Sequence, residues 1–232
     1  GGCKKWKNNV VDSNVNQIYQ IKNGQMILIE DNLGSVSMTD PATLTGFIQY
    51  CSGNFPANRY ELILWDHGGG SVSGYGYDQK FSNYGSMNLA GIKTALNNGG
   101  VKFDFVGFDA CLMATLENGL MLADYADYMI ASEESEPGIG WSYTNWLNKL
   151  SADTSVSTLE LGKTICDSFE YGTSEKSSTS GTVPVLRMGN IVDGSIDWTD
   201  LVYTDNMQDI EKLSLKKDDV LFNRTNSPIY VG

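Results

Sequence analysis

The stretch KFDFVGFDACLMATLE (residues 102–117) changes from an apolar run to helical spacing at the triplet DAC, residues 109–111. The apolar run 103–108 predicts a strand covered on both faces. A helix is predicted after it from the spacing of Leu112, Leu116, Leu120 and Ala123. A cysteine at such a turn lies at a sheet edge and at a helix N-terminus, which favours the thiolate. We therefore expect Cys111 to be reactive.

The chain has a single histidine, His67, which ends the preceding apolar run in LILWDHGGG, residues 62–70. Residues 60–65 predict another buried strand, and one crossover helix separates it from residues 103–108. In a parallel sheet, active sites form outside the carboxyl ends of the strands. We therefore expect His67 and Cys111 on the same sheet edge, on neighbouring strands.

A thiolate nucleophile with an imidazole as proton carrier is the minimum for covalent acyl transfer. The backbone N–H groups of Gly68 and Cys111 are candidates for an oxyanion hole, since glycine lets a substrate carbonyl approach closely. The simpler explanations are a structural cysteine and a histidine that caps a turn. The order of the two residues, each at a strand end, favours catalysis. Residues 68–85 are rich in glycine but lack a phosphate-binding motif, which favours a substrate-side loop.

Strand and helix patterns alternate along the chain, as is typical of an α/β protein with a mostly parallel sheet between helix layers. Asp40-Pro41 predicts a helix start, with a capping carboxylate and proline at the first helical position. The apolar face of that helix consists of Leu44, Phe47, Ile48 and Cys51. A second helix carries Leu89, Ile92 and Leu96 and is stopped by Gly99-Gly100. We also expect a buried-type strand at 26–30, a strand at 128–132, and helices at 141–150 and 157–169.

Composition excludes several classes of protein. The 232 residues include 28 acidic and 16 basic side chains, a formal net charge of −12, whereas phosphate binding needs clustered Lys and Arg. Four cysteines without a CxxC pair disfavour a zinc site. Their number would allow two disulfides, although Cys51 is expected to pack as a small hydrophobe. No apolar run approaches about 18 residues, so no membrane span is expected.

Four blocks occur in order along the chain: LILWDHGGG (62–70), GYGYD (74–78), FDFVGFDACLMATLE (103–117) and ASEESEPGIGW (131–141). Together, over about residues 1–169, they resemble the clostripain family of cysteine peptidases. The resemblance implies a caspase-like three-layer α/β/α sandwich and an endopeptidase with His67 and Cys111 as its catalytic dyad. It also implies protein or peptide substrates cleaved after Arg or Lys, with Asp109 as the substrate-binding residue. A buried carboxylate suits a basic side chain, and a turn cap is the alternative role for Asp109.

The resemblance also bears on activation and on metal. Family members are often cleaved between the histidine and the cysteine, and Lys80 is the candidate for self-cleavage, at Lys80-Phe81. If Lys80→Ala matured as the wild type does, that hypothesis would be dropped. Some relatives need calcium, for which the acidic side chains of residues 133–136 are candidates, although a solvated loop is the simpler explanation. No other cofactor is expected. The family usually begins with a further strand and helix, so the resemblance implies that these two elements are missing from the domain. The absence of an initiator methionine indicates that the chain begins inside a longer protein.

Residues 170–232 change in character to a Ser/Thr/Gly loop, short strands, one helix near 206–213 and a strand in residues 218–224. This part resembles the start of a target-recognition domain from the specificity subunit of a type I restriction-modification system. The alternative function is therefore DNA recognition without enzymatic activity, in a chain fused or truncated near residues 167–171. However, ten acidic against six basic residues predict weak DNA binding. The peptidase implies a secreted bacterial protein, and the specificity subunit implies a cytoplasmic one.

Overall fold

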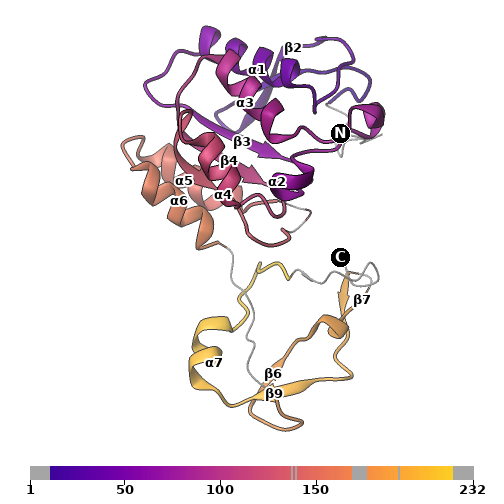
Figure 1. Ribbon diagram of the computed structural model, residues 1–232. Helices are drawn as coiled ribbons and strands as arrows, with labels where there is room; N and C mark the ends of the chain where they lie inside the picture. Colours follow the sequence, from indigo (N-terminus) through magenta and orange to yellow (C-terminus); the bar gives the residue numbers. More distant parts are fainter. Residues whose placement is uncertain (1–10, 137, 139, 169–176, 193, 222–232) are drawn as a thin grey trace. The chain divides into compact units, whose positions relative to one another are not determined.

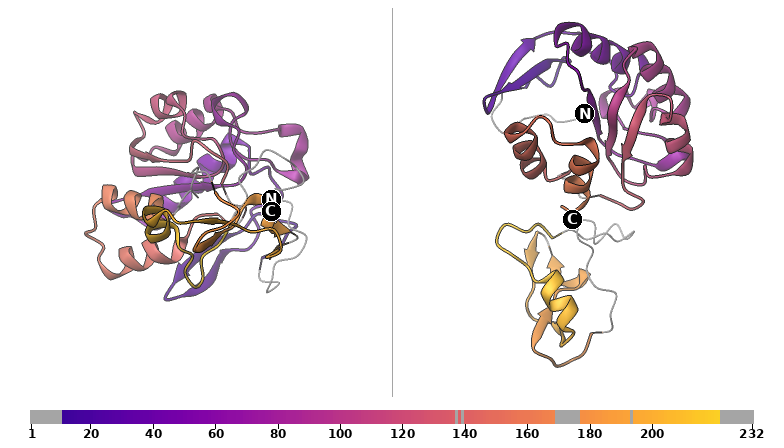
Figure 2. Two further views of the ribbon diagram at one scale, coloured as in Figure 1. Left: turned by 90° about the horizontal axis from the view of Figure 1, so that it is seen from below. Right: turned by 90° about the vertical axis from the view of Figure 1, so that its left-hand side faces the viewer.

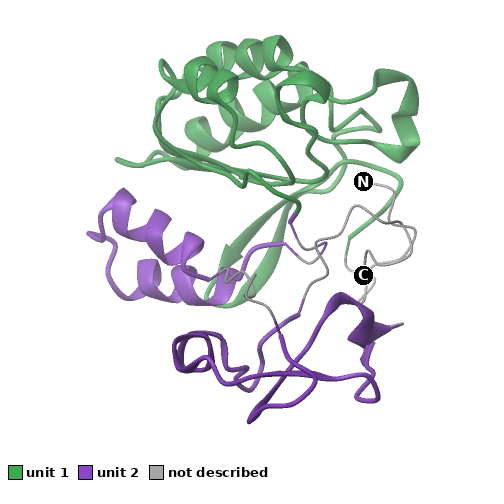
Figure 3. Ribbon diagram, turned by 60° about the horizontal axis from the view of Figure 1, so that its bottom comes forward, with its two compact units in different colours: residues 1–135 green, residues 136–232 purple. Residues whose placement is uncertain are grey.

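The computed structural model describes residues 11–136, 138, 140–168, 177–192 and 194–221, whose elements are shown from three directions (Figures 1 and 2). The chain forms two compact units, residues 1–135 and 136–232 (Figure 3). The predicted domain boundary at 169/170 borders residues outside the described ranges and stays a prediction. Both predicted site residues, His67 and Cys111, belong to the first unit.

A three-stranded parallel sheet lies at the centre of the first unit, in the order β3 (Glu61–Trp65), β4 (Phe103–Asp109) and β5 (Ala126–Ile130). Six of the seven residues of β4 are buried, as its continuous apolar run predicts for a central strand covered on both faces. Trp65 is paired in register with Asp109, so β3 and β4 end level with each other. The predicted parallel sheet is thus confirmed, and the residues that follow β3 and β4 meet at one edge.

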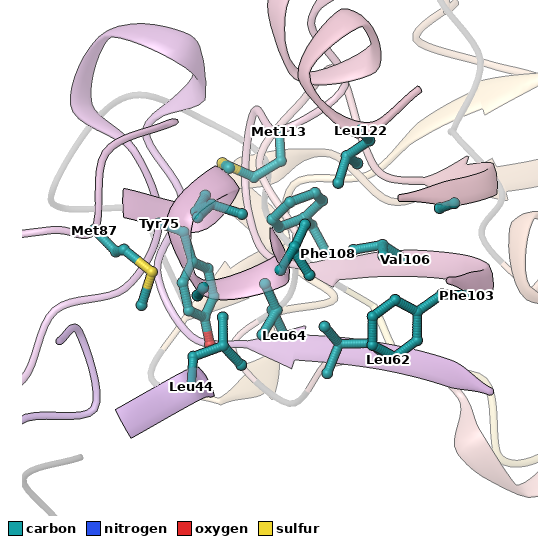
Figure 4. Close-up of a cluster of buried hydrophobic side chains, with 14 of the residues drawn as sticks. Leu44, Leu62, Leu64, Tyr75, Met87, Phe103, Val106, Phe108, Met113 and Leu122 are labelled. Carbon is teal, nitrogen blue, oxygen red and sulfur yellow. The ribbon is translucent and has the colours of Figure 1, made fainter. Parts of the chain in front are cut away.

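Helices α1 (Pro41–Asn54) and α3 (Leu89–Gly99) pack against each other and against one face of this sheet (Figure 2). The predicted caps are present. Asp40 Oδ1 accepts a hydrogen bond from the N–H of Ala42 at 2.8 Å, and Gly100 ends α3 in the left-handed conformation, with φ of 69°. The helices contribute Leu44, Ile48, Ile92, Ala95 and Leu96 to the buried core cluster. Figure 4 shows Leu44 of this cluster with the sheet side chains Leu62, Leu64, Val106 and Phe108.

The segment after Cys111 differs from its prediction. Helix α4 spans Leu116–Leu122, and its buried residues are Asn118 and Leu122. Leu116 and Leu120, which were predicted to form the apolar face, are 75% and 68% exposed. The physical reason is a turn at residues 111–112 followed by three irregular residues, which delay the helix and rotate a different face toward the core.

The strand expected at 26–30 exists as β2 (Gln25–Glu30), but the expectation that it is buried was wrong. It pairs with β1 (Ile18–Lys22) in a two-stranded antiparallel hairpin, and Met26, Ile27 and Leu28 are 38–45% exposed. Asn23 and Gly24 have φ values of 52° and 70°, as a two-residue type I′ turn requires. A local hairpin therefore replaces the predicted place in the parallel sheet.

The second unit begins with two predicted helices, α5 (Tyr143–Ala152) and α6 (Thr158–Cys166). Two short antiparallel ladders follow, β6 (Val183–Val185) with β9 (Val202–Thr204) and β7 (Ile191–Val192) with β8 (Ser195–Ile196). The helix predicted near 206–213 is α7 (Met207–Leu213), capped by the side chain of Asn206. Residues 218–221 form no strand, in contrast to the prediction, because a turn with Asp218 at φ 74° occupies this position; residues 222–224 lie outside the described ranges.

The second helix layer of the expected three-layer sandwich stays a prediction, because α5 and α6 belong to the other unit. No helix in the described part of the chain is long and apolar enough to span a lipid bilayer.

Candidate active site

His67 lies two residues beyond the end of β3, in a short antiparallel ribbon that pairs residues 67–69 with residues 74–76 of the glycine-rich segment. Its N–H donates to Asp66 Oδ1 at 2.6 Å and its carbonyl accepts from the N–H of Gly76 at 2.7 Å. The N–H of Gly69 donates to the carbonyl of Gly74 at 2.9 Å, across the short helix α2 (Gly70–Ser73). The backbone of His67 is thus held on both sides, while its side chain is exposed at the sheet edge.

Cys111 lies two residues beyond the end of β4, at the tip of a turn. Ala110 before it and Met113 after it are buried, Cys111 itself is half-buried, and Leu112 is 43% exposed. The turn thus brings the cysteine to the surface between two residues anchored in the core.

The His67 loop and the Cys111 turn touch each other. A Cβ atom built on Gly68 would lie 2.0 Å from the carbonyl oxygen of Cys111 and 3.0 Å from its carbonyl carbon and its nitrogen. Real Cβ atoms do not approach so closely, so only glycine fits at position 68. The residue next to His67 therefore packs directly on the backbone of Cys111. The two predicted site residues follow the ends of neighbouring strands, at one edge of the sheet.

Cys111 is not at a helix N-terminus, so the prediction that placed it there was wrong. Helix α4 begins at Leu116, five residues later, and its N-cap is Thr115, whose side chain accepts from the N–H of Asn118. The influence of a helix dipole falls off within about one turn. The helix argument for a thiolate therefore does not apply, and His67 is the predicted partner that remains.

The segment of residues 132–135, here called the acidic loop, lies beside the Cys111 turn. The N–H of Leu112 donates to the carbonyl of Glu134 at 3.0 Å, and the N–H of Ala114 donates to the carbonyl of Ser132 at 3.0 Å. Two acidic side chains, Glu133 and Glu134, are therefore carried on a segment hydrogen-bonded to the residues after Cys111. No three His, Cys, Asp or Glu side chains come together as a metal site within the described ranges, so the calcium hypothesis gains no support.

Asp109 is the last residue of β4 and is only 2% exposed. Side chains alternate between the two faces of a strand. Phe108 belongs to the core cluster, so Asp109 lies on the opposite face, beside the partly exposed Trp65 with which it is paired in register. A carboxylate thus lies buried two residues before the predicted nucleophile.

Lys80 is exposed at the start of a 3₁₀ segment, η1 (Gln79–Tyr84). Its N–H donates to Asp78 Oδ1 at 3.0 Å and its Nζ donates to the carbonyl of Ser13. Phe81 departs from helical geometry, with φ of −125° and ψ of 45°, so the chain kinks immediately after Lys80. Self-cleavage at Lys80-Phe81 stays a prediction.

The described cysteines, Cys51, Cys111 and Cys166, are thiols rather than disulfides. Burial raises the pKa of the Cys51 thiol. Desolvation, followed by the charge of the neighbouring Asp167, raises the pKa of the Cys166 thiol. A raised pKa keeps a thiol protonated at neutral pH and lowers its reactivity. These two cysteines are therefore internal controls for reagents that attack thiolates.

Comparison with known proteins shows one family. A family model described as "Clostripain family" matches residues 9–230. Clostripain from Hathewaya histolytica is 29% identical over 132 residues, which is 50% of this chain and 25% of clostripain. The chain therefore spans about a quarter of that relative.

Two solved structures share the fold. A secreted C11 cysteine protease from Bacteroides thetaiotaomicron, in complex with an irreversible peptide inhibitor, superposes with a TM-score of 0.56 and 22% identity, over 75% of this chain and 50% of that one. A structure of the secreted C11 protease iotapain, from the same organism, gives a TM-score of 0.52 and 19% identity, over 65% and 46%. The chain thus spans about half of each solved protein.

The family match also bears on residues 170–232. It continues through residues 167–171 and on to residue 230, whereas none of the comparisons supports a restriction specificity subunit. The predicted junction, the DNA-recognition fragment and DNA as a partner are therefore without support. Short antiparallel ladders and one small helix occur in many folds, so the pattern of this segment was too general to identify a family.

Proposed function

The chain belongs to the clostripain family of cysteine peptidases, and we propose that it is an endopeptidase domain with Cys111 as nucleophile and His67 as general acid and base. The observation that carries the proposal is the contact between Gly68 and the backbone of Cys111, which brings the two strand ends together. A sole histidine beside a half-buried cysteine supplies the two groups that thiol-based acyl transfer needs.

The reaction follows from these two groups. His67 takes the thiol proton, and Cys111 Sγ attacks the carbonyl carbon of the scissile peptide bond, which gives a tetrahedral oxyanion. The oxyanion collapses, the C–N bond breaks, and His67 gives its proton to the departing amine. The thioester that remains is attacked by water, from which His67 removes a proton. The C–S bond then breaks, the acid product leaves, and His67 returns the proton to Cys111 Sγ, which restores the thiol.

We propose the N–H groups of Gly68 and Cys111 as donors to that oxyanion. Support comes from the ribbon around His67, in which Gly68 and Tyr75 form an antiparallel bridge. The hydrogen bonds of this bridge are made by the flanking residues, His67 with Gly76 and Gly69 with Gly74. In such a pair the N–H of the central residue points away from its partner strand. The N–H of Gly68 is therefore directed out of the ribbon, away from Tyr75, which supports it as a candidate donor.

We propose that Asp109 selects Arg or Lys before the scissile bond. The proposal rests on its burial and on its place two residues before Cys111, since a desolvated carboxylate forms a strong charge-assisted contact with a cation. Glu133 and Glu134, on the loop bonded to the Cys111 turn, add negative charge on the approach to the site.

A thiol-reactive peptide that ends in Arg tests this function. One equivalent is expected to attach to Cys111 and to abolish cleavage of an Arg-amide substrate in proportion to labelling. Cys51 and Cys166 should stay unlabelled at neutral pH, because their raised pKa values keep them protonated, and should react only as the pH becomes alkaline. The readout is mass mapping of the labelled cysteine. Full activity of Cys111→Ala, or labelling of Cys51 or Cys166 in place of Cys111 at neutral pH, would contradict the proposal.

A further inference from the structure

Leu112, the residue directly after the proposed nucleophile, has a left-handed backbone with φ of 63°. Two other non-glycine residues of the described chain have positive φ, Asn23 and Asp218. Asn and Asp tolerate this region because their short side chains bond locally, whereas leucine rarely adopts it. A leucine is thus held in an unfavourable conformation at the tip of the active-site turn.

The peptide between Cys111 and Leu112 is fixed on both sides. The described peptide bonds are trans, so its C=O and N–H point in opposite directions. The carbonyl of Cys111 packs against the Cα of Gly68, next to His67. The N–H of Leu112 donates to the carbonyl of Glu134 at 3.0 Å. The plane of this peptide therefore lies between the His67 loop and the acidic loop.

The chain after Leu112 is anchored by Asn118, a fully buried residue of α4. Its Nδ2 donates to the carbonyl of Met113 at 2.7 Å, and the N–H of Thr115 donates to the same carbonyl at 2.9 Å. The side chain of Met113 itself is buried in the core (Figure 4). A strained conformation persists only where its surroundings over-determine it, and here both flanks of Leu112 are held.

We propose that Leu112 is a positioning residue, whose left-handed backbone turns the peptide after Cys111 so that the thiol is presented to His67. The inference rests on the proposed function, in which Cys111 is the nucleophile. The proposed role belongs to the backbone conformation, because Leu112 is 43% exposed and is not part of the buried core cluster. Strained residues concentrate at active sites, where small displacements of reacting groups have large effects on rate.

Three variants separate the effect of the Leu112 backbone conformation on kcat from the effect of its side chain. Leu112→Ile keeps the volume and polarity but adds a β-branch, which makes positive φ a genuine outlier. Its kcat on an Arg-amide substrate is expected to fall roughly tenfold to a hundredfold at unchanged KM. Leu112→Gly accepts the left-handed region freely and should stay within about threefold of the wild type. Leu116→Ile, at an exposed position of α4, is the matched control and should behave as the wild type.

The outcomes of these experiments distinguish the positioning role of Leu112 from the proposed function. A normal kcat for Leu112→Ile, or an equal loss of kcat in Leu112→Gly, overturns the positioning role. The proposed function is still supported in that case if Cys111 is labelled in the wild type. Absence of Cys111 labelling, with full activity of Cys111→Ala, overturns the proposed function itself. If Leu112→Ile does not fold, Asn118→Leu tests the turn from its other flank, since Thr115 still satisfies the Met113 carbonyl. A lowered kcat at unchanged KM supports the inference, and a normal kcat overturns it.

Discussion

Replacing Gly68 with alanine is expected to lower kcat/KM on an Arg-amide substrate by at least about a hundredfold. The added Cβ would lie 2.0 Å from the carbonyl oxygen of Cys111, and its three nearest atoms all belong to the backbone of Cys111. No side-chain rotation can relieve this overlap, so the His67 loop and the Cys111 turn must separate. A displacement of about 1 Å between reacting groups is enough for such a loss of rate.

The same substitution should destabilise the fold, by about 3 kcal/mol or more, since overpacking against backbone is near the upper end of such effects. The matched control is Gly46→Ala in α1, where an added Cβ would meet nothing within 4 Å. That variant should be active and more stable by about 0.5–1 kcal/mol, because alanine is the better helix former. Denaturant unfolding and peptidase assays measure both effects. Wild-type stability and activity of Gly68→Ala would show that the two loops are not in contact.

Much of the fold follows from short-range rules. The cap at Asp40-Pro41, the stop at Gly99-Gly100 and the apolar runs of β3 and β4 were each predicted, because local chemistry alone specifies them. The ends of parallel strands meet at one edge, so the sequence could also predict that His67 and Cys111 share it.

The details around Cys111 could not be predicted in this way. Leucine gives no signal for positive φ, so Leu112 itself did not mark the turn that delays α4 to Leu116. Only Thr115, a favourable N-cap residue before the helix, pointed to the later start. The bonds that hold the turn come from Glu134 and Ser132, whose backbone carbonyls have no sequence signature. Likewise, the exposure of β2 depends on its pairing with β1 alone in the described chain.

Asp109→Asn is expected to reduce kcat/KM on Arg- and Lys-amide substrates by roughly thirtyfold to a hundred-and-fiftyfold. Asparagine is nearly isosteric, so the change removes the charge and leaves the volume of this buried position filled. A hydrogen bond between charged groups contributes about 2–3 kcal/mol, and each 1.4 kcal/mol is about tenfold in rate or affinity. The loss should therefore fall on substrates whose side chain is a cation.

A substrate with citrulline in place of arginine is the control, because citrulline has nearly the same shape without the charge. Its slow cleavage should be unchanged or improved in Asp109→Asn, so the preference for arginine over citrulline should collapse. If Asp109 acted only as a cap that holds the turn before Cys111, both substrates would lose activity equally and their ratio would stay constant. The ratio of the two kcat/KM values thus separates a role in substrate selection from a role in the architecture of the turn, and an unchanged ratio would exclude Asp109 as the selecting group.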